Sequence, residues 1–296
     1  MNIPFSVIIA TTHAWPELKM TLDSLWPQLQ SLGGELIIGD GDGRGIPTDF
    51  VTQFPGAVCV TMPGASIFAL RSACIQRSRG DIVFLTEDHC VLSENWCAGL
   101  LESHRKYPCA AVISGSIENG SADKLMDWAN FFIAHGPMMG PVKEGESRHI
   151  SLSAAAFKRS ALPREFPPEG VMEMLYLMEL SRQGGKLFNN NKVSVAHVQS
   201  FGFWNTFAVH YHNGRSIAGF RKRSAGPWSR LLRIGSCAIL PVFLLARSGY
   251  GVLRKRRFVS QFLLAFPLMA ALATCHAAGE LMGYLAGPGN SPAKLS

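Results

Sequence analysis

A chain of 296 residues can bury a full hydrophobic core, and one large domain with an appendage is the natural expectation. The seven cysteines are odd in number and scattered, with no CxxC or CxxH pair, which argues against a disulfide framework or structural zinc and indicates a reducing compartment. The net charge of +7 hides an asymmetry: residues 180–296 carry 15 basic residues and one acidic residue (net +14), whereas residues 1–179 carry 13 and 20 (net −7).

The first 90 residues alternate short apolar runs with amphipathic stretches. The N-terminal run has no basic region and is too short for a signal peptide, so it predicts a first strand. Strands are predicted at residues 5–10, 35–40, 58–62 and 82–85, and helices at residues 16–29 and 67–77. Strand and helix alternate, which predicts a parallel sheet with right-handed crossovers.

The pattern continues less regularly beyond residue 90. We expect a helix at residues 94–107 and a strand at 110–114, followed by a stretch with several glycines. Residues 171–183 predict a strong helix, which Gly184-Gly185 would end.

Three metal-ligand residue types follow the predicted strand at 82–85: Glu87, Asp88 and His89. In open α/β sheets, ligands bind at the carboxyl ends of strands. Two carboxylates and an imidazole there can hold a hard divalent cation, which can in turn hold a diphosphate. The alternative is a polar strand exit whose charges face water.

The basic rear of the chain contains two apolar segments, residues 231–246 and 258–286, separated by five basic residues. A membrane span needs about 20 apolar residues, so the second segment is long enough and the first is marginal. If both segments crossed the membrane as a hairpin, the basic loop between them would lie on the opposite side from the N-terminal part of the chain. Such a topology contradicts the tendency of basic loops to stay on the cytoplasmic side.

We therefore expect an interfacial or re-entrant first segment on the cytoplasmic leaflet, with the second segment spanning the membrane or lying in its surface. The alternative is a hydrophobic helical pair packed on a soluble domain. Nucleic-acid binding fits poorly, because the basic residues interleave with long aliphatic runs.

Several short motifs occur in an ordered series. They are Ala10-Thr11-Thr12-His13, Glu35 to Asp40, Arg71-Ser72-Ala73-Cys74, Arg79-Gly80-Asp81, Glu87-Asp88-His89 upstream of Trp96, Glu173-Met174 with Gly185 twelve residues after the Glu, and His197. In this order and spacing, the sequence resembles the family-2 glycosyltransferases over about residues 4–215. The triplet 87–89 aligns with that family's DxD motif.

The resemblance implies an α/β GT-A fold with a Rossmann-like sheet, which we place at residues 1–220. The apolar, basic rear predicts C-terminal hydrophobic, membrane-associated helices at residues 221–296. The resemblance also implies transfer of a sugar, with inversion, from a nucleotide-diphospho-sugar. The location at the cytoplasmic face of the inner membrane suggests a lipid-linked or polysaccharide acceptor and an anionic membrane partner.

The resemblance also assigns roles to residues. Thr11, His13, Asp40, Arg71 and Asp88 would contact the nucleotide-sugar. Glu87, Asp88, His89 and His197 would place Mg²⁺ or Mn²⁺ on the diphosphate. Glu173 would be the catalytic base.

One departure bears on catalysis: Met174 stands where the family has its usual catalytic Asp. Glu173 is the nearest substitute, although neighbouring helix positions point about 100° apart. Asp88 or Glu169 could act instead, and Glu173 could simply be a carboxylate favoured at a helix N-terminus.

Two alternative functions follow. One is a catalytically silent GT-A module that binds a nucleotide-sugar or a partner protein. The other is a nucleotidyltransferase, ranked last because residues 10–13 lack its Gly-rich, basic phosphate loop.

Overall fold

The chain divides into two compact units. The computed structural model describes residues 3–12, 15–43, 47, 50–170 and 172–295. The first unit, which we call the sheet unit, comprises Met1–Gly120 and Gly140–Val198. The second, the helical unit, comprises Ser121–Met139 and Gln199–Leu295. The domain boundary predicted at residue 220 is not tested by this grouping and stays a prediction.

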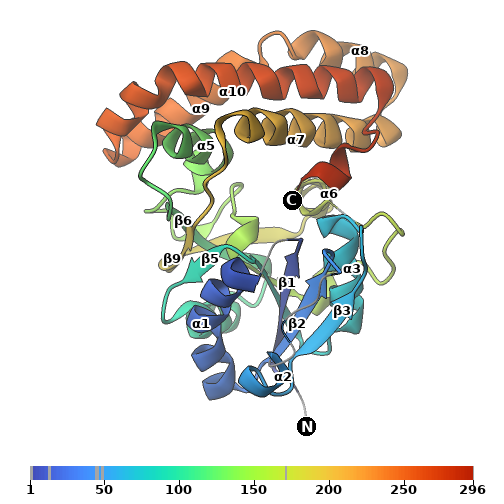
Figure 1. Cartoon of the computed structure of the whole chain (residues 1–296), viewed down its shortest axis with the longest axis vertical. Helices are drawn as coiled ribbons and strands as arrows, with labels where there is room; N and C mark the ends of the chain where they lie inside the picture. The colour runs from blue at the N-terminus through green and yellow to red at the C-terminus, as the bar shows by residue number, and fades with distance from the viewer. Residues whose placement is uncertain (1–2, 13–14, 44–46, 48–49, 171, 296) are drawn as a thin grey trace. The chain divides into compact units, whose positions relative to one another are not determined.

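The sheet unit is built on one mixed sheet (Figure 1). In the described residues its strand order is β3-β2-β1-β4-β8-β6-β9-β5, and β7 pairs with β9 off this path. The strands are β1 (Phe5–Thr11), β2 (Glu35–Asp40), β3 (Val58–Thr61), β4 (Ile82–Glu87), β5 (Cys90–Leu92), β6 (Ala110–Asn119), β7 (Gly145–Glu146), β8 (Ala155–Lys158) and β9 (Lys186–His197).

Helices cover this sheet. α3 contacts β1 and β2, α4 contacts β6 and β9, and α1 contacts β5 and α4. The helices of the sheet unit are α1 (Trp15–Leu32), α2 (Phe50–Gln53), α3 (Ile67–Arg77), α4 (Trp96–Lys106) and α6 (Glu173–Arg182), with 3-10 turns at Leu152–Ala154 and Arg159–Ala161.

The parallel half of the sheet agrees with the sequence prediction. β1 and β2 are buried along their whole length, as expected for strands covered on both faces. β1 pairs in parallel with β2 and with β4, so Thr11, Asp40 and Glu87 end neighbouring strands. The helix predicted at residues 67–77 is confirmed, and Ser66 caps it by accepting a hydrogen bond from the Ala69 amide.

In the other half of the sheet, the strand predicted at residues 110–114 is part of β6, but the antiparallel pairings were not predicted. β8 inserts antiparallel between β4 and β6, and β5 pairs antiparallel with β9. β6 and β9 are parallel, with an irregular register between Ser114 and Ser116. This half brings the end of β9 beside the residues that follow β4, because Cys90 lies opposite His197.

Three aromatic rings fix the position of β4 in the core. Phe84 stacks on Phe5 of β1, with ring centroids 5.0 Å apart, and its ring meets Trp96 of α4 edge-on at 5.2 Å. All three side chains are fully buried. The strand that ends at Glu87 is therefore held from β1 and from α4, and its end is fixed relative to both.

A buried histidine joins α4 to β8. The Nε2–H of His104 donates to the Ala156 carbonyl at 3.0 Å. Burial lowers the pKa of His104 from 6.5 to about 4. The unfolded chain therefore takes up a proton at this side chain below pH 6.5, whereas the folded protein does so only near pH 4.

We predict that His104 makes the protein less stable as the pH falls from 6.5 to about 4, by about 3 kcal/mol. Gln can still donate to the Ala156 carbonyl but does not titrate. The free energy of unfolding of His104→Gln should therefore fall less over this pH range than that of the wild type. Urea unfolding of both proteins across this pH range is the measurement. Equal pH dependence in the two proteins would contradict the prediction.

The helical unit consists of five α-helices within the described residues (Figure 1). α10 contacts each of the other four. Short 3-10 turns occur at Gly136–Met138 and Ser291–Lys294. The helices are α5 (Leu125–His135), α7 (Phe203–Ser224), α8 (Pro227–Ser236), α9 (Leu240–Lys255) and α10 (Val259–Ala286).

Glycines bring α7 and α10 into close contact. A Cβ on Gly279 would overlap the Tyr211 carbonyl, and one on Gly214 would overlap the His276 carbonyl. The same face of α10 is polar: Glu280 Oε1 lies 3.8 Å from Arg221 Nη1 of α7 and 3.5 Å from His276 Nε2. The two helices thus share a close-packed contact that includes buried charge.

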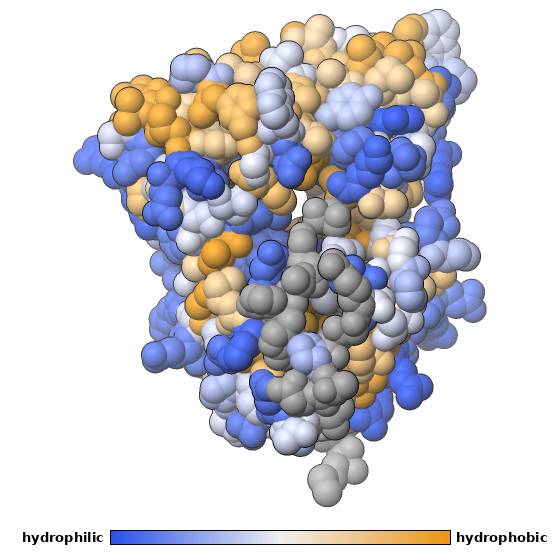
Figure 2. Space-filling view, viewed as in Figure 1, coloured by the Kyte–Doolittle hydropathy of each residue, from blue (hydrophilic) through white to orange (hydrophobic). Residues whose placement is uncertain are grey.

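α10 is long and apolar enough to cross a membrane, and α8 and α9, joined at a bend of 67°, would pass the same test as a pair. Many large apolar side chains of this unit are exposed, and on the face seen in Figure 2 they gather over α9 and α10. The exposed apolar side chains of the whole unit include Phe203, Trp204, Trp228, Leu231, Leu232, Ile239, Val242, Phe243, Tyr250, Leu253, Leu263, Leu264 and Phe266.

We predict that Gly279→Ala destabilises the helical unit by about 1–3 kcal/mol, because the added methyl group forces α7 and α10 apart. Gly235 of α8 is the matched control, since a Cβ there meets nothing within 4 Å. Gly235→Ala should be neutral or stabilising by up to about 1 kcal/mol. Thermal unfolding of the two variants compares them, and equal melting temperatures would refute the close packing.

Candidate active site

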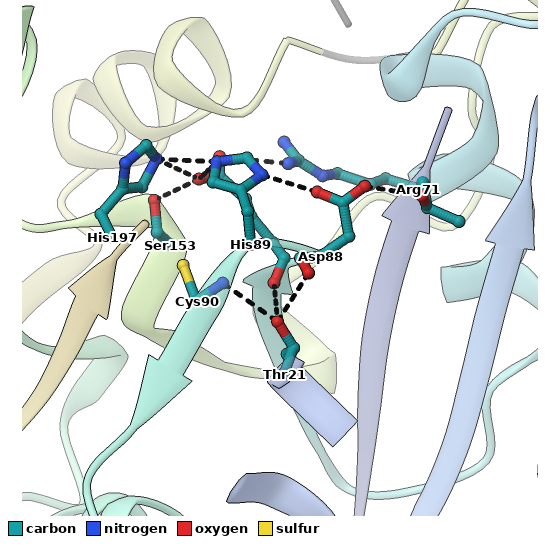
Figure 3. A network of polar contacts seen from close by, with 9 residues as sticks. Thr21, Arg71, Asp88, His89, Cys90, Ser153 and His197 are labelled. Carbon is teal, nitrogen blue, oxygen red and sulfur yellow. Dashed lines mark hydrogen bonds and ion pairs between the residues drawn. The ribbon is translucent and has the colours of Figure 1, made fainter. Parts of the chain in front are cut away.

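The carboxyl ends of β1, β4 and β9 place a group of polar side chains together (Figure 3). Glu87 ends β4, and Asp88 and His89 form the turn into β5. His197 ends β9 and reaches this turn because β5 pairs with β9. Thr11 ends β1 on the other side of β4. The parallel strands and the antiparallel β5–β9 pair thus assemble residues that are up to 186 positions apart.

Glu87, His89 and His197 form one compact group. Their nearest ligand atoms all lie within 4.8 Å of one another, and in the described part of the chain this is the group of three such side chains that could hold a metal ion. His197 Nε2 lies 3.0 Å from Glu87 Oε2 and 2.9 Å from His89 Nε2. One carboxylate and two imidazoles thus converge on a common point.

Asp88 acts on this group through His89. Its Oδ1 accepts a hydrogen bond from His89 Nδ1 at 2.6 Å, and its Oδ2 accepts one from the Thr11 hydroxyl at 2.6 Å. A neutral imidazole that donates from Nδ1 has a lone pair on Nε2, and His89 Nε2 faces His197. This carboxylate–imidazole arrangement is the one that commonly orients histidine ligands of metals.

The turn that carries Asp88 is itself anchored to α1. The Thr21 hydroxyl donates to the Asp88 carbonyl at 2.7 Å and accepts from the Cys90 amide at 3.0 Å. Thr21 is fully buried. The backbone between β4 and β5 is therefore fixed by a side chain of α1, and this fixes the directions of the Asp88 and His89 side chains.

Arg71 of α3 joins the group to α6. Its Nη2 donates to Glu87 Oε1 at 3.3 Å, and its Nη1 donates to Glu173 Oε1 at 3.2 Å. Ser153 donates to the other oxygen of Glu87 at 2.9 Å. Glu173, the first residue of α6, is buried and Glu87 is partly buried, so Arg71 lies between two carboxylates that are largely shielded from water.

The charges of the site favour an ionised Glu87. Burial works to raise the pKa of Glu87, but the hydrogen bond from His197 and the charges of His197, His89 and Arg71 hold it well below its usual range. Burial lowers the pKa of His197, against the attraction of Glu87. A metal cation binds an anionic carboxylate and a neutral imidazole, so the lowered pKa values of Glu87 and His197 both favour ligation.

Asp40 ends β2 beside Thr11. Its Oδ1 accepts from the amides of Asp42 and Gly43, at 3.1 and 3.3 Å. Its Oδ2 is buried and has no hydrogen-bond partner in the described ranges. One acceptor atom is therefore left for a donor group outside these contacts.

The structure thus brings most of the predicted site residues together. Thr11, Arg71, Glu87, Asp88, His89, Glu173 and His197 form one connected network, and Asp40 lies on the neighbouring strand. His13 lies outside the described residues, and the side chain of Glu169 is exposed. The roles assigned to these residues stay predictions.

Two residues that contact the site, Ser153 and Thr21, were not predicted from the sequence. For Ser153 the sequence carries no signal. Thr21 is a polar residue between the apolar positions Leu18 and Leu25 on the buried face of α1, and that pattern was a usable hint.

Comparison with known proteins places this site in a family. The sequence profile described as Glycosyl transferase family 2 matches residues 6–166, more than half of the chain. The chain belongs to glycosyl transferase family 2. It is a glycosyltransferase, and its sheet unit has the GT-A fold. No curated protein sequence matches it significantly.

Solved structures resemble this family member in fold. A mannosyltransferase from Pyrobaculum calidifontis, PcManGT, in complex with GDP-Man and Mn²⁺, is 15% identical with a TM-score of 0.60, over 95% of this chain and 88% of that one. S. aureus TarS 1-349 is 12% identical with a TM-score of 0.51, over 96% and 91%. GalNAc-T7 with UDP, GalNAc and Mn²⁺ is 16% identical with a TM-score of 0.50, over 68% and 44%.

We predict that Arg71→Met destabilises the protein by about 3–5 kcal/mol, because it leaves one buried and one partly buried carboxylate without their cation. Arg182→Met is the matched control: it breaks an exposed Arg–Glu pair on α6 and should not measurably change stability. Chemical denaturation gives both values. The triple variant R71M/E87Q/E173Q should recover part of the loss, and similar stability of the two single variants would show that the buried bridge matters little.

Proposed function

We propose that the protein transfers a sugar, with inversion, from a nucleotide-diphospho-sugar to a lipid-linked or glycan acceptor at the cytoplasmic face of the membrane, and that a divalent cation assists. The group formed by Glu87, His89 and His197 at the strand ends carries this proposal. Its position is the ligand-binding edge of an open α/β sheet. The boundary at residue 220, between the transferase domain and the membrane-associated segment, belongs to the same proposal.

The donor atoms of this group fit a divalent cation. Glu87 is ionised, and His89 presents the lone pair of Nε2 because Asp88 holds its Nδ1–H. His197 Nε2 donates to Glu87 Oε2 at 3.0 Å, and its Nδ1–H tautomer would turn a lone pair to the cation. Bound there, the cation would supply a positive charge to the diphosphate leaving group.

Two imidazole nitrogens favour a first-row transition metal over Mg²⁺, which prefers oxygen ligands and water. We therefore propose Mn²⁺ ahead of Mg²⁺. The Mn²⁺ in the structures of PcManGT and GalNAc-T7 supports the choice.

The remaining roles follow from the hydrogen bonds of the site. Asp40 Oδ2 is a buried acceptor without a partner in the described part of the sheet unit, so we propose that it accepts a hydrogen bond from the nucleotide. Glu173 is proposed as the base that removes the proton of the acceptor hydroxyl as its oxygen attacks the anomeric carbon. Arg71 orients Glu173 through its Oε1 and keeps it next to Glu87.

The helical unit supports membrane association. Its exposed apolar side chains and net positive charge are the combination that binds anionic bilayer surfaces. For α10 we propose a position in the membrane surface instead of a span. The face of α10 that packs on α7 carries Glu280 and His276, next to Arg221, and a span would bring this buried charge into the hydrocarbon layer.

The test is nucleotide release from a panel of UDP- and GDP-sugars by purified, detergent-solubilised protein, with Mn²⁺, with Mg²⁺ or with EDTA. We expect release from one donor, faster with Mn²⁺ than with Mg²⁺ and abolished by EDTA. Glu87→Ala should lower the rate by at least about 100-fold, since it removes a ligand of the cation.

Two further variants separate catalysis from binding. Glu173→Gln should abolish transfer to an added acceptor and leave donor binding intact, because the Gln amide oxygen can still accept a hydrogen bond from Arg71 but cannot take up the proton of the acceptor hydroxyl. Lys19→Gln, in an exposed i,i+4 pair with Asp23 on α1, is the control that should change neither. Metal-dependent donor binding by the wild type without transfer to any acceptor would favour the catalytically silent module, and no donor binding at all would refute the proposal.

A further inference from the structure

A groove of about 480 Å³ opens on the helical unit where α7 gives way to α8. It is lined by Lys222, Ala225, Pro227, Arg230, Leu231 and Ile234. Two of these side chains are cationic and the other four are apolar. The groove therefore combines a positively charged wall with an aliphatic one.

The two cations are close together. Lys222 Nζ donates to the Leu285 carbonyl at 2.9 Å, and Arg230 Nη2 donates to the same oxygen at 3.1 Å. The two nitrogens can be no further apart than the sum of these distances. Each group keeps further N–H donors, since an ammonium has three and a guanidinium has five.

No carboxylate pairs with either cation among the residues that the structure describes. Glu280, the one acidic residue after residue 180, is engaged with Arg221 and His276. Two neighbouring positive charges that meet only a neutral carbonyl attract an anion.

The surface of α8 indicates the kind of molecule that carries this anion. Trp228, Leu231 and Leu232 form a stripe at i, i+3 and i+4, and 80%, 58% and 76% of their surface is exposed. Arg230, on the other side of the helix, is only half-buried in the groove. A helix with an outward apolar stripe that includes Trp lies at the boundary between lipid headgroups and acyl chains.

We propose that this groove binds the phosphodiester headgroup of an anionic membrane phospholipid, with Lys222 and Arg230 on the phosphate and Leu231 and Ile234 against the start of the acyl chains. The inference rests on the proposed membrane association and makes it specific. The preference for anionic lipid would then come from one defined binding site. It would not come from electrostatic attraction spread over all the basic residues of the unit.

The test is co-flotation of the full-length protein with vesicles, either of pure phosphatidylcholine or with about one quarter phosphatidylglycerol, in about 0.1 M salt. The readout is the preference for the anionic vesicles, given as the ratio of the two partition coefficients. We expect K222Q/R230Q to lower this ratio by about tenfold or more. The charge-keeping variant K222R/R230K should retain it.

The matched control is R223Q/R254Q, which removes the same charge from two exposed positions of the same unit. It should lower the ratio by no more than about threefold. Equal losses in the two double variants would mean diffuse electrostatic attraction and would overturn the site. If K222Q/R230Q keeps the wild-type ratio but has a lower melting temperature, the two cations only cap the C-terminal end of α10. That result would also overturn the lipid site.

Failure of this inference can be told apart from failure of the proposed function. Metal-dependent nucleotide release in detergent does not involve the groove, so K222Q/R230Q should release nucleotide at the wild-type rate. If the wild type floats with neither kind of vesicle while still releasing nucleotide, the membrane association and the lipid site both fall and the transferase reaction stands. If it floats with anionic vesicles but releases nothing, the lipid site stands alone.

Discussion

The buried guanidinium of Arg71 allows two carboxylates to lie side by side at the carboxyl edge of the sheet. Burial alone would favour the neutral acid form of Glu87, and a protonated Glu87 would be a poor metal ligand. With Arg71 on one oxygen and His197 and Ser153 on the other, Glu87 is held as an anion in a fixed orientation. The same guanidinium fixes Glu173, and so connects the proposed metal site to the proposed base.

The sequence was sufficient to predict the parallel half of the fold. A strand that is covered on both faces appears in the sequence as a short apolar run between glycines and turn residues. The sequence pattern did not predict β8, whose sequence Ala155-Ala156-Phe157-Lys158 is neither β-branched nor alternating, nor β5, which has only three residues. Both strands depend on pairing with distant partners, and single-chain periodicity cannot report such pairings. In the parallel half the strand ends were predicted to within two residues: β2 ends at Asp40 as predicted, whereas β4 continues two residues beyond the predicted end, to Glu87.

The gathering of the site residues was predictable, but their contacts were not. Because parallel strands end at the same edge of the sheet, Glu87 and Thr11 were expected to lie close together. Which side chain each of them contacts depends on atomic positions that the sequence pattern does not give. Asp88 illustrates this: in the sequence it is a ligand type like its neighbours, and in the structure its carboxylate orients the ring of His89. The Arg71–Glu173 bridge spans 102 positions and has no local signature. Composition likewise suggested a membrane-binding rear, but it could not reveal that α8 exposes its apolar stripe.

The pairing of β5 with β9 also bears on the order in which the site can form. Glu87 and His89 are synthesised more than 100 residues before His197, and the strand that positions His197 is the last of the sheet. A nascent chain that ends before β9 can form the β1–β4 layer with Arg71 on Glu87, but it lacks the second imidazole, the partner strand of β5 and a parallel neighbour of β6. Because contacts of high sequence separation form slowly, the proposed cation site is completed only when the sheet unit is complete.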